Sequence, residues 1–144
     1  MDKRIFAVLV ILAVLMAGCA FASDSTGDNS VVISGLNFTV PDGYTEDVDE
    51  EVVNESGSDD NQNYVMSSKT FEKGDENLFL ISISTFEENM TDDYIKDLGE
   101  KATFGNVTGY IEDMGFLSIF SYIQDGKVVV ITANDKSVIE EVFS

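Results

Sequence analysis

Apolar and polar residues alternate along the chain after residue 30, at the spacing of two that is typical of β-strands with one buried face. Leu36, Phe38 and Val40 show this pattern, and the Pro-Asp-Gly sequence at residues 41–43 then favours a turn. Acidic residues interrupt the alternation from residue 45, and it resumes after residue 63. The pattern predicts strands at residues 31–33, 36–40, 64–71, 78–86, 107–112, 117–123 and 127–133.

The last two predicted strands, at residues 117–123 and 127–133, form the clearest hairpin in the sequence. Asp125 and Gly126 lie between them, and an Asp-Gly pair favours a tight hairpin turn. Both strands are apolar on both faces, which is typical of strands that are covered on each side. We therefore expect this hairpin inside the sheet, because at an edge it would invite pairing with another molecule.

Two helices are predicted. The first begins after Thr91, a suitable N-cap, and ends at Gly99. The second covers about residues 135–143, with Asn134 or Asp135 as its N-cap. Its apolar stripe consists of Val138, Ile139, Val142 and Phe143. A helix with such a stripe is expected to pack on the sheet.

The acidic stretch from Thr45 to Gln62 does not fit the strand pattern. Its like charges repel one another, and Val48, Val52 and Val53 are its only apolar residues. We predict a mobile acidic loop at about residues 45–62, with a fragment of helix around Asp49 to Val53.

Hairpin connections dominate this order of elements, so the predicted fold class is α+β. We expect a mainly antiparallel β-sheet with about two helices packed on it. Residues 31–144 have the length of one ordinary domain. A signal segment is expected to precede this domain.

The first 22 residues have the three parts of a secretory signal. Lys3 and Arg4 form a basic start, an apolar run follows from Ile5 to Met16, and small residues end the segment. This leader places the rest of the chain outside the cytoplasm, at the cell surface or secreted. The small polar residues 23–30 are expected to form a flexible tether.

Three endings of the leader are consistent with the sequence. Ala20-Phe21-Ala22 fits the A-x-A pattern of an ordinary signal peptidase, which would leave Ser23 as the first residue. Met16 to Cys19 resembles a lipoprotein signal, in which Cys19 would carry the lipid. An uncleaved anchor is the third ending, because residues 5–22 approach the length that spans a bilayer. The last two endings would attach the protein to a membrane.

The formal net charge of −19 restricts the partners of the chain. Such a surface repels nucleic acid and anionic lipid, and it suits solubility, cation-rich surroundings and basic partners. General acidity that keeps the protein in solution explains the charge more readily than a dedicated partner site does. Carboxylates between Asp47 and Asp60 have the chemistry that attracts calcium, but the ligand order of an EF-hand loop is missing. We therefore assign no metal ligand.

Most catalytic arrangements are excluded by composition. The chain has no histidine, and its one cysteine, Cys19, lies in the leader. No phosphate-binding or dinucleotide-binding glycine motif is present, so no cofactor is expected. Carboxylate pairs of the kind that hydrolyse glycosides are what remains. The sequence leaves open whether the protein is an enzyme, and it favours a non-enzymatic role.

One short motif recurs, the Asn-x-Ser/Thr acceptor of N-glycosylation. It occurs at Asn37, Asn54, Asn89 and Asn106. Asn54 and Asn89 lie in predicted loops and are the expected acceptors, whereas Asn37 lies on the polar face of a strand and Asn106 at a strand entrance. Coincidence in a chain rich in Asn and Thr is the alternative.

Residues 32–44 contain a Gly-x-x-Phe-x-Val-Pro-x-Gly-Tyr segment. This segment resembles the opening of a group of small exported proteins from methanogenic archaea. The order of elements is also similar to the PsbP-type sandwich of an antiparallel sheet with helices. The resemblance implies an exported α+β domain, and it carries no catalytic residues with it.

These observations lead to two functional expectations. The first is a non-enzymatic module of the cell surface, tethered or secreted, that binds an unknown envelope component or has a structural role in the envelope. The alternative is a small carboxylate-based hydrolase of cell-wall polymer, which requires two facing carboxylates in a cleft.

Overall fold

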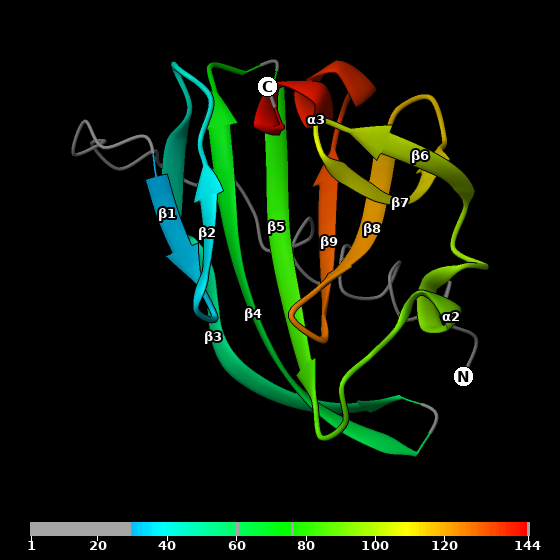
Figure 1. Cartoon of the computed structure of the whole chain (residues 1–144). Helices are drawn as coiled ribbons and strands as arrows, with labels where there is room; N and C mark the ends of the chain where they lie inside the picture. The colour runs from blue at the N-terminus through cyan, green and yellow to red at the C-terminus, as the bar shows by residue number, and fades with distance from the viewer. Residues whose placement is uncertain (1–29, 60, 76, 144) are drawn as a thin grey trace.

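The computed structural model describes residues 30–59, 61–75 and 77–143. The predicted leader at residues 1–22 lies outside these residues. So does the predicted tether, except for Ser30, which is the first residue of a strand. The described part of the chain forms a long curved sheet with a short hairpin and two helices packed on it (Figure 1).

The large sheet has seven antiparallel strands in the order β3-β4-β5-β9-β8-β7-β6. The strands are β3 (Thr45–Asp59), β4 (Gln62–Lys73), β5 (Asn77–Phe86), β6 (Glu100–Phe104), β7 (Val107–Asp113), β8 (Ser118–Gln124) and β9 (Lys127–Ala133). A separate hairpin consists of β1 (Ser30–Ile33) and β2 (Leu36–Thr39). The helices are α2 (Asp92–Ile95) and α3 (Lys136–Val142). The predicted α+β class is therefore confirmed.

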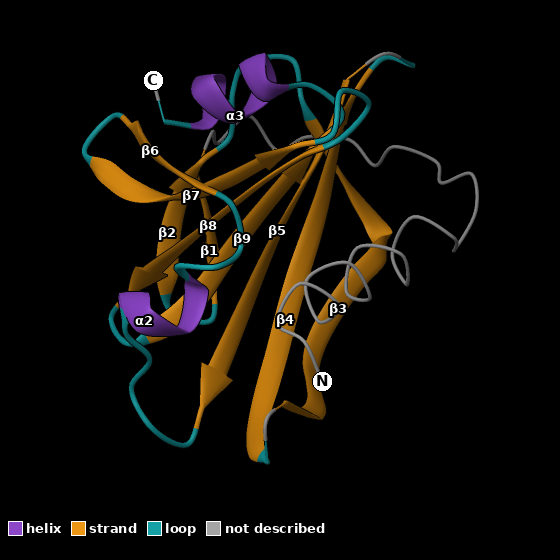
Figure 2. Cartoon of the chain, turned by 90° about the vertical axis from the view of Figure 1, so that its right-hand side faces the viewer, coloured by secondary structure: helices purple, strands orange, loops and turns teal. Residues whose placement is uncertain are grey.

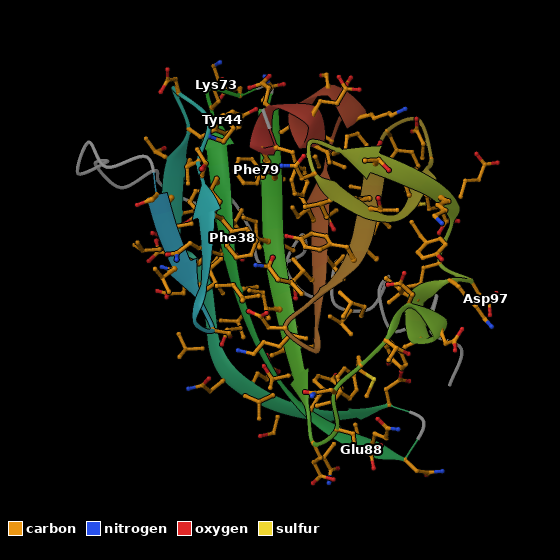
Figure 3. All side chains as sticks on the ribbon, viewed as in Figure 1. Phe38, Tyr44, Lys73, Phe79, Glu88 and Asp97 are labelled. Carbon is orange, nitrogen blue, oxygen red and sulfur yellow. The ribbon has the colours of Figure 1, made fainter. Side chains whose placement is uncertain are left out.

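One face of the sheet, which we call the apolar face, holds the larger core. It carries the buried side chains of Phe71, Phe79, Ile81, Phe120, Val129 and Ile131. The β1–β2 hairpin and α3 lie in front of this face in Figure 1. Phe38 and Tyr44 point toward Phe79 between the hairpin and the sheet (Figure 3), and the Tyr44 and Phe79 rings meet edge to face at 5.0 Å. Such aromatic contacts add to the stabilisation from burial.

The predicted central hairpin is confirmed. β8 and β9 pair through Asp125 and Gly126, whose φ angles of 52° and 75° are those of a tight hairpin turn. β5 pairs with β9 and β7 pairs with β8, so neither strand is at an edge. The last helix is also confirmed: Asp135 caps α3 by accepting a hydrogen bond from the Ser137 amide at 2.8 Å.

The predicted acidic loop is wrong. Residues 45–59 form β3, the longest strand, and no helix occurs around Asp49 to Val53. β3 pairs with β4, with register shifts on both sides of Val52. The strand lies at the edge of the sheet, where its carboxylates reach water, and charged residues at an edge discourage pairing with other molecules. The charge pattern thus belongs to an edge strand and not to a loop.

Two further differences concern residues 91–104. The first helix is shorter than expected, because α2 ends at Ile95, and Thr91 makes no side-chain capping bond. Gly99 is needed for close packing and not as a helix cap: a Cβ there would lie 2.2 Å from the Ile111 carbonyl oxygen. Residues 100–104 form β6, an edge strand that the pattern did not predict.

Candidate functional site

The face of the sheet opposite the apolar face is lined by small hydroxyl side chains, and we call it the hydroxyl face. Its buried hydroxyl residues are Ser68, Thr70, Ser82, Ser84, Ser121 and Thr132. Antiparallel pairing places them side by side in rows across the sheet, because paired residues point to the same face. In one row Ser68 pairs with Ser82, and Ser82 pairs with Val130. In the next row Thr70 pairs with Leu80, and Leu80 pairs with Thr132.

Most of these hydroxyls lack hydrogen-bond partners. The oxygens of Ser68, Thr70, Ser121 and Thr132 are buried and make no hydrogen bond within the described part of the chain. Three acceptor oxygens at the β3 side of the same face are also buried without a hydrogen-bond partner among the described residues. They belong to Asp47, Asp59 and Gln62. Buried polar atoms in native proteins nearly always have hydrogen-bond partners, so a concentration of unpartnered oxygens on one face of the sheet requires an explanation.

Two carboxylates stand at opposite ends of β3 on the hydroxyl face. Asp47 pairs in register with Thr70 and is 1% exposed. Its Oδ1 accepts a hydrogen bond from the Asp49 backbone amide at 3.1 Å, and its Oδ2 has no partner among residues 30–59, 61–75 and 77–143. Asp59 is 2% exposed, and its Oδ2 accepts a hydrogen bond from the Tyr94 hydroxyl of the segment that follows β5. These oxygens accept hydrogen bonds and cannot donate when ionised.

The carboxylates near Asp47 also affect Glu72 at the end of β4. Burial raises the pKa of Glu72, and repulsion from Asp47, Glu50 and Asp75 raises it further. This part of the sheet is therefore an electrostatically unfavourable place for another negative charge, and it attracts cations.

The lysines of the central strands do not neutralise the hydroxyl face. Lys69, Lys73 and Lys127 occupy register positions of the apolar face. Lys69 contacts Glu46 at 2.7 Å and Glu51 at 3.2 Å. Burial opposes its charge, but these carboxylates outweigh burial and raise the pKa of Lys69. Lys127 donates to the Ser34 carbonyl at 2.6 Å.

Among the described elements, α2 is the one that packs on the hydroxyl face. Ile95 and Leu98 lie against Phe86, Ile119 and Val128 in a second, smaller core. α2 also lies beside β7 and β8, and its Tyr94 donates the hydrogen bond to Asp59 of β3. Figure 2 shows no described helix or hairpin over β4 and β5 on this side. Leu80, in the middle of this region, belongs to neither core cluster.

Carboxylates also line a hollow of about 530 Å³ elsewhere, between the segment before β6 and the start of α3. Its acidic residues are Glu100, Glu112 and Asp113, and Lys136 completes the lining. Within residues 30–143, apart from 60 and 76, no group of three or more acidic or cysteine side chains is placed to hold a metal ion. The carboxylates of β3 therefore do not converge on a calcium site in the part of the chain that is described.

The structure places the four predicted glycosylation asparagines on different elements, and all four are exposed: Asn37, Asn54, Asn89 and Asn106. Asn54 lies in β3 and not in a loop, with a φ of 52° beside a register shift. Asn89 lies in the loop that was expected. Cys19, the predicted lipidation residue, lies outside the described residues.

The hydroxyl face was not predicted from the sequence, although the sequence contains a pattern that indicates it. In Leu80-Ile81-Ser82-Ile83-Ser84, large apolar residues alternate with small hydroxyl residues. This alternation is the period-two pattern of a strand with two different environments. The sequence predicts cover on both faces only at the start of this strand, where Leu78 and Leu80 lie opposite Phe79 and Ile81.

No helix in the described residues has the length and apolar character needed to cross a bilayer. No protein-family model, curated protein or solved structure matches the chain. The functional argument therefore depends on the chain's own residues.

Proposed function

We propose that the protein is a non-enzymatic module of the cell envelope, exported by its leader, whose hydroxyl face binds a cationic segment of a partner. The observation that supports this most is the set of unpartnered oxygens on that face: Ser68, Thr70, Ser121, Thr132, Asp47, Asp59 and Gln62. The secretory-signal pattern of residues 1–22, including Cys19 as a candidate lipidation residue, and the resemblance to small exported archaeal proteins support the location.

The hydrogen-bonding groups and charges of the hydroxyl face indicate which kind of partner it binds. Carboxylate and amide oxygens need donors, and hydroxyls can either donate or accept. A segment with Lys or Arg side chains supplies charge-assisted donors to Asp47 and Asp59. A second copy of this acidic chain, nucleic acid or an anionic polymer would place like charges together. The buried apolar side chains of Met66, Leu80 and Val130 lie on the same face as the polar groups.

The affinity test uses the chain that begins at Ser23, the product of the cleavage expected after Ala22. A ten-residue peptide of alternating lysine and serine is titrated calorimetrically at physiological salt, with a glutamate-serine peptide for comparison. We expect binding of the lysine peptide only. The double variant Asp47→Asn with Asp59→Asn should weaken it by about tenfold or more, the effect of losing a buried charge contact.

The matched control removes the same net charge elsewhere. Glu88 lies in the loop after β5, at the lower end of the molecule in Figure 3, and Glu140 is exposed on α3. Glu88→Gln with Glu140→Gln should change the affinity by less than about twofold, because exposed charges are screened. Equal weakening by both double variants would show only a diffuse attraction and would contradict the proposed face.

A second candidate is the carboxylate-based hydrolase of cell-wall polymer. The acidic hollow with Glu100, Glu112 and Asp113 is the observation that favours it. This candidate predicts release of reducing ends from isolated envelope polymer, and loss of that activity in Glu112→Gln or Asp113→Asn. Unchanged polymer after prolonged incubation with the protein would exclude it.

A further inference from the structure

The four glycosylation sequons differ in what their side chains already do in the folded chain. Asn54 is fixed against β4: its backbone N–H donates to the Ser67 hydroxyl at 3.0 Å, and that hydroxyl donates to the side-chain Oδ1 of Asn54 at 3.4 Å. Asn89 is packed on the β8–β9 turn, since its Oδ1 and Cγ would lie 2.4 and 2.7 Å from a Cβ built on Gly126. The two asparagines that were expected to be the best acceptors are therefore the two whose side chains are engaged.

Asn37 and Asn106 have open surroundings. Asn37 lies on β2 between Leu36 and Phe38, which point into the core, so its side chain faces outward. Asn106 lies in the turn between β6 and β7 and is exposed. The hydroxyl residues two positions later, Thr39 and Thr108, are exposed, as are Ser56 and Thr91 of the other two sequons. The Thr108 hydroxyl shares a hydrogen bond with the Thr103 hydroxyl at 2.9 Å, so the selection among the sequons depends on the asparagine side chains.

Both open sequons lie on the side of the sheet that carries the hairpin and α3. Asn37 belongs to the hairpin that packs on the apolar face. Asn106 follows Gly105, whose Cβ position would be 2.8 Å from the Phe143 carbonyl oxygen at the end of α3. Sugars at these positions would leave the hydroxyl face free for its partner.

We infer that the exported chain is N-glycosylated at Asn37 and Asn106 and not at Asn54 or Asn89, an inference that rests on the proposed export. The side-chain nitrogen of the asparagine forms a bond to the anomeric carbon of a sugar carried by a polyprenyl phosphate. The bond from that carbon to the phosphate oxygen breaks, the polyprenyl phosphate leaves with the bonding electrons, and the proton lost by the nitrogen passes to water. The hydroxyl two residues later is required for the acceptor to be recognised.

The test is the intact mass of the full chain expressed and recovered from its native cells, together with mass spectra of its peptides. We expect the mature chain to carry two glycans. Asn37→Gln and Asn106→Gln should each remove one glycan, whereas Asn54→Gln and Asn89→Gln should remove none. Thr39→Val should abolish modification of Asn37, and Thr39→Ser should retain it, which separates recognition of the hydroxyl from any effect on folding.

The outcomes separate this inference from the proposed function. A chain that has lost its leader and carries no sugar would overturn the inference and leave export intact. Sugars on Asn54 or Asn89 would overturn the selection by side-chain contacts. A chain that keeps residues 1–22 and is recovered from the cytoplasm without sugar would overturn both proposals.

Discussion

At the scale of single residues, Gly109 shows how closely the strands are packed. A Cβ at this position would lie 2.2 Å from the Ser121 carbonyl oxygen and 2.9 Å from the Tyr122 Cβ. The pairing of β7 with β8 begins at the next residue, Tyr110, so a side chain at Gly109 would push the two strands apart.

We expect Gly109→Ala to lower the free energy of unfolding by about 3 kcal/mol, the cost of overpacking a well-packed core. Gly74→Ala is the comparison, because its φ of 61° is unfavourable for alanine but nothing lies within 4 Å of its Cβ position. That variant should lose about 1 kcal/mol. Urea denaturation of both variants measures the difference, and equal losses would contradict the packing described for β7 and β8.

Glu72 is the residue whose ionisation most directly reports the acidic end of the hydroxyl face. Its pKa is raised above the ordinary value of 4.5 by burial and by neighbouring carboxylates. A raised pKa means that the folded chain takes up the proton more readily than the unfolded chain. The resulting stabilisation is present below pH 4.5 and is lost as the pH rises through the pKa of the folded chain.

Glu72→Gln should therefore increase the free energy of unfolding at pH 7, by less than about 1 kcal/mol for a partly exposed group. The increase should disappear near pH 4, where the glutamate is itself neutral. Thermal unfolding at several pH values tests this, with the exposed Glu140→Gln as the control. A constant difference between pH 7 and pH 4 would mean that charge repulsion is not the cause.

At the scale of elements, β3 determines whether the sheet ends or continues into another molecule. It is an edge strand of fifteen residues with exposed carboxylates at Asp49, Glu51 and Glu55. An edge of this length would be prone to pairing with other chains if it were uncharged.

The triple variant Asp49→Asn, Glu51→Gln and Glu55→Gln is expected to associate into dimers or larger species at concentrations where the parent chain is monomeric. Size-exclusion chromatography with light scattering measures the effect, and addition of salt to the parent chain should reproduce part of it. Neutralising three exposed acids away from the edge, Asp92, Glu88 and Glu140, should leave the chain monomeric. Association of this control would attribute the effect to net charge instead of the edge.

The elements were predicted to different extents from the sequence, for physical reasons. The β8–β9 hairpin was predictable because Asp125-Gly126 determines a local turn and both strands are apolar on two faces. β3 was not, because its pairing depends on β4 and on the contacts of Lys69 with Glu46 and Glu51, which are distant in sequence. The hydroxyl face is indicated only in part, by the alternation in β5, since its rows form only when β4, β5, β8 and β9 are aligned.

At the scale of the whole molecule, three tyrosines link stability to alkaline pH. Burial raises the pKa of Tyr122, and burial with a nearby carboxylate raises those of Tyr44 and Tyr64. The unfolded chain therefore releases these protons first, and the stabilisation present below pH 10 is lost as the pH rises above it.

We expect cooperative unfolding above about pH 10, which far-ultraviolet circular dichroism detects. Tyr122→Phe should move the alkaline midpoint to higher pH, because the phenylalanine has no proton to lose. A midpoint that does not move would show that the ionisation of Tyr122 does not control this transition.

The proposed function concerns the molecule as a two-sided sheet, with a packed apolar face and a hydroxyl face that receives a partner. Leu80 and Ile81 are neighbours in β5 whose side chains point to opposite faces, and Val130 and Val129 are the corresponding neighbours in β9. Within each pair, the methyl groups of one residue report on the hydroxyl face and those of its neighbour report on the apolar face.

The most direct test is a methyl NMR titration of the chain beginning at Ser23 with the lysine-serine peptide. The account predicts intermolecular nuclear Overhauser effects to Leu80 and Val130, with none to Ile81 and Val129. Effects confined to Ile81 and Val129, or shifts restricted to exposed residues of β3 with no change at Leu80, would contradict the hydroxyl face as the binding surface.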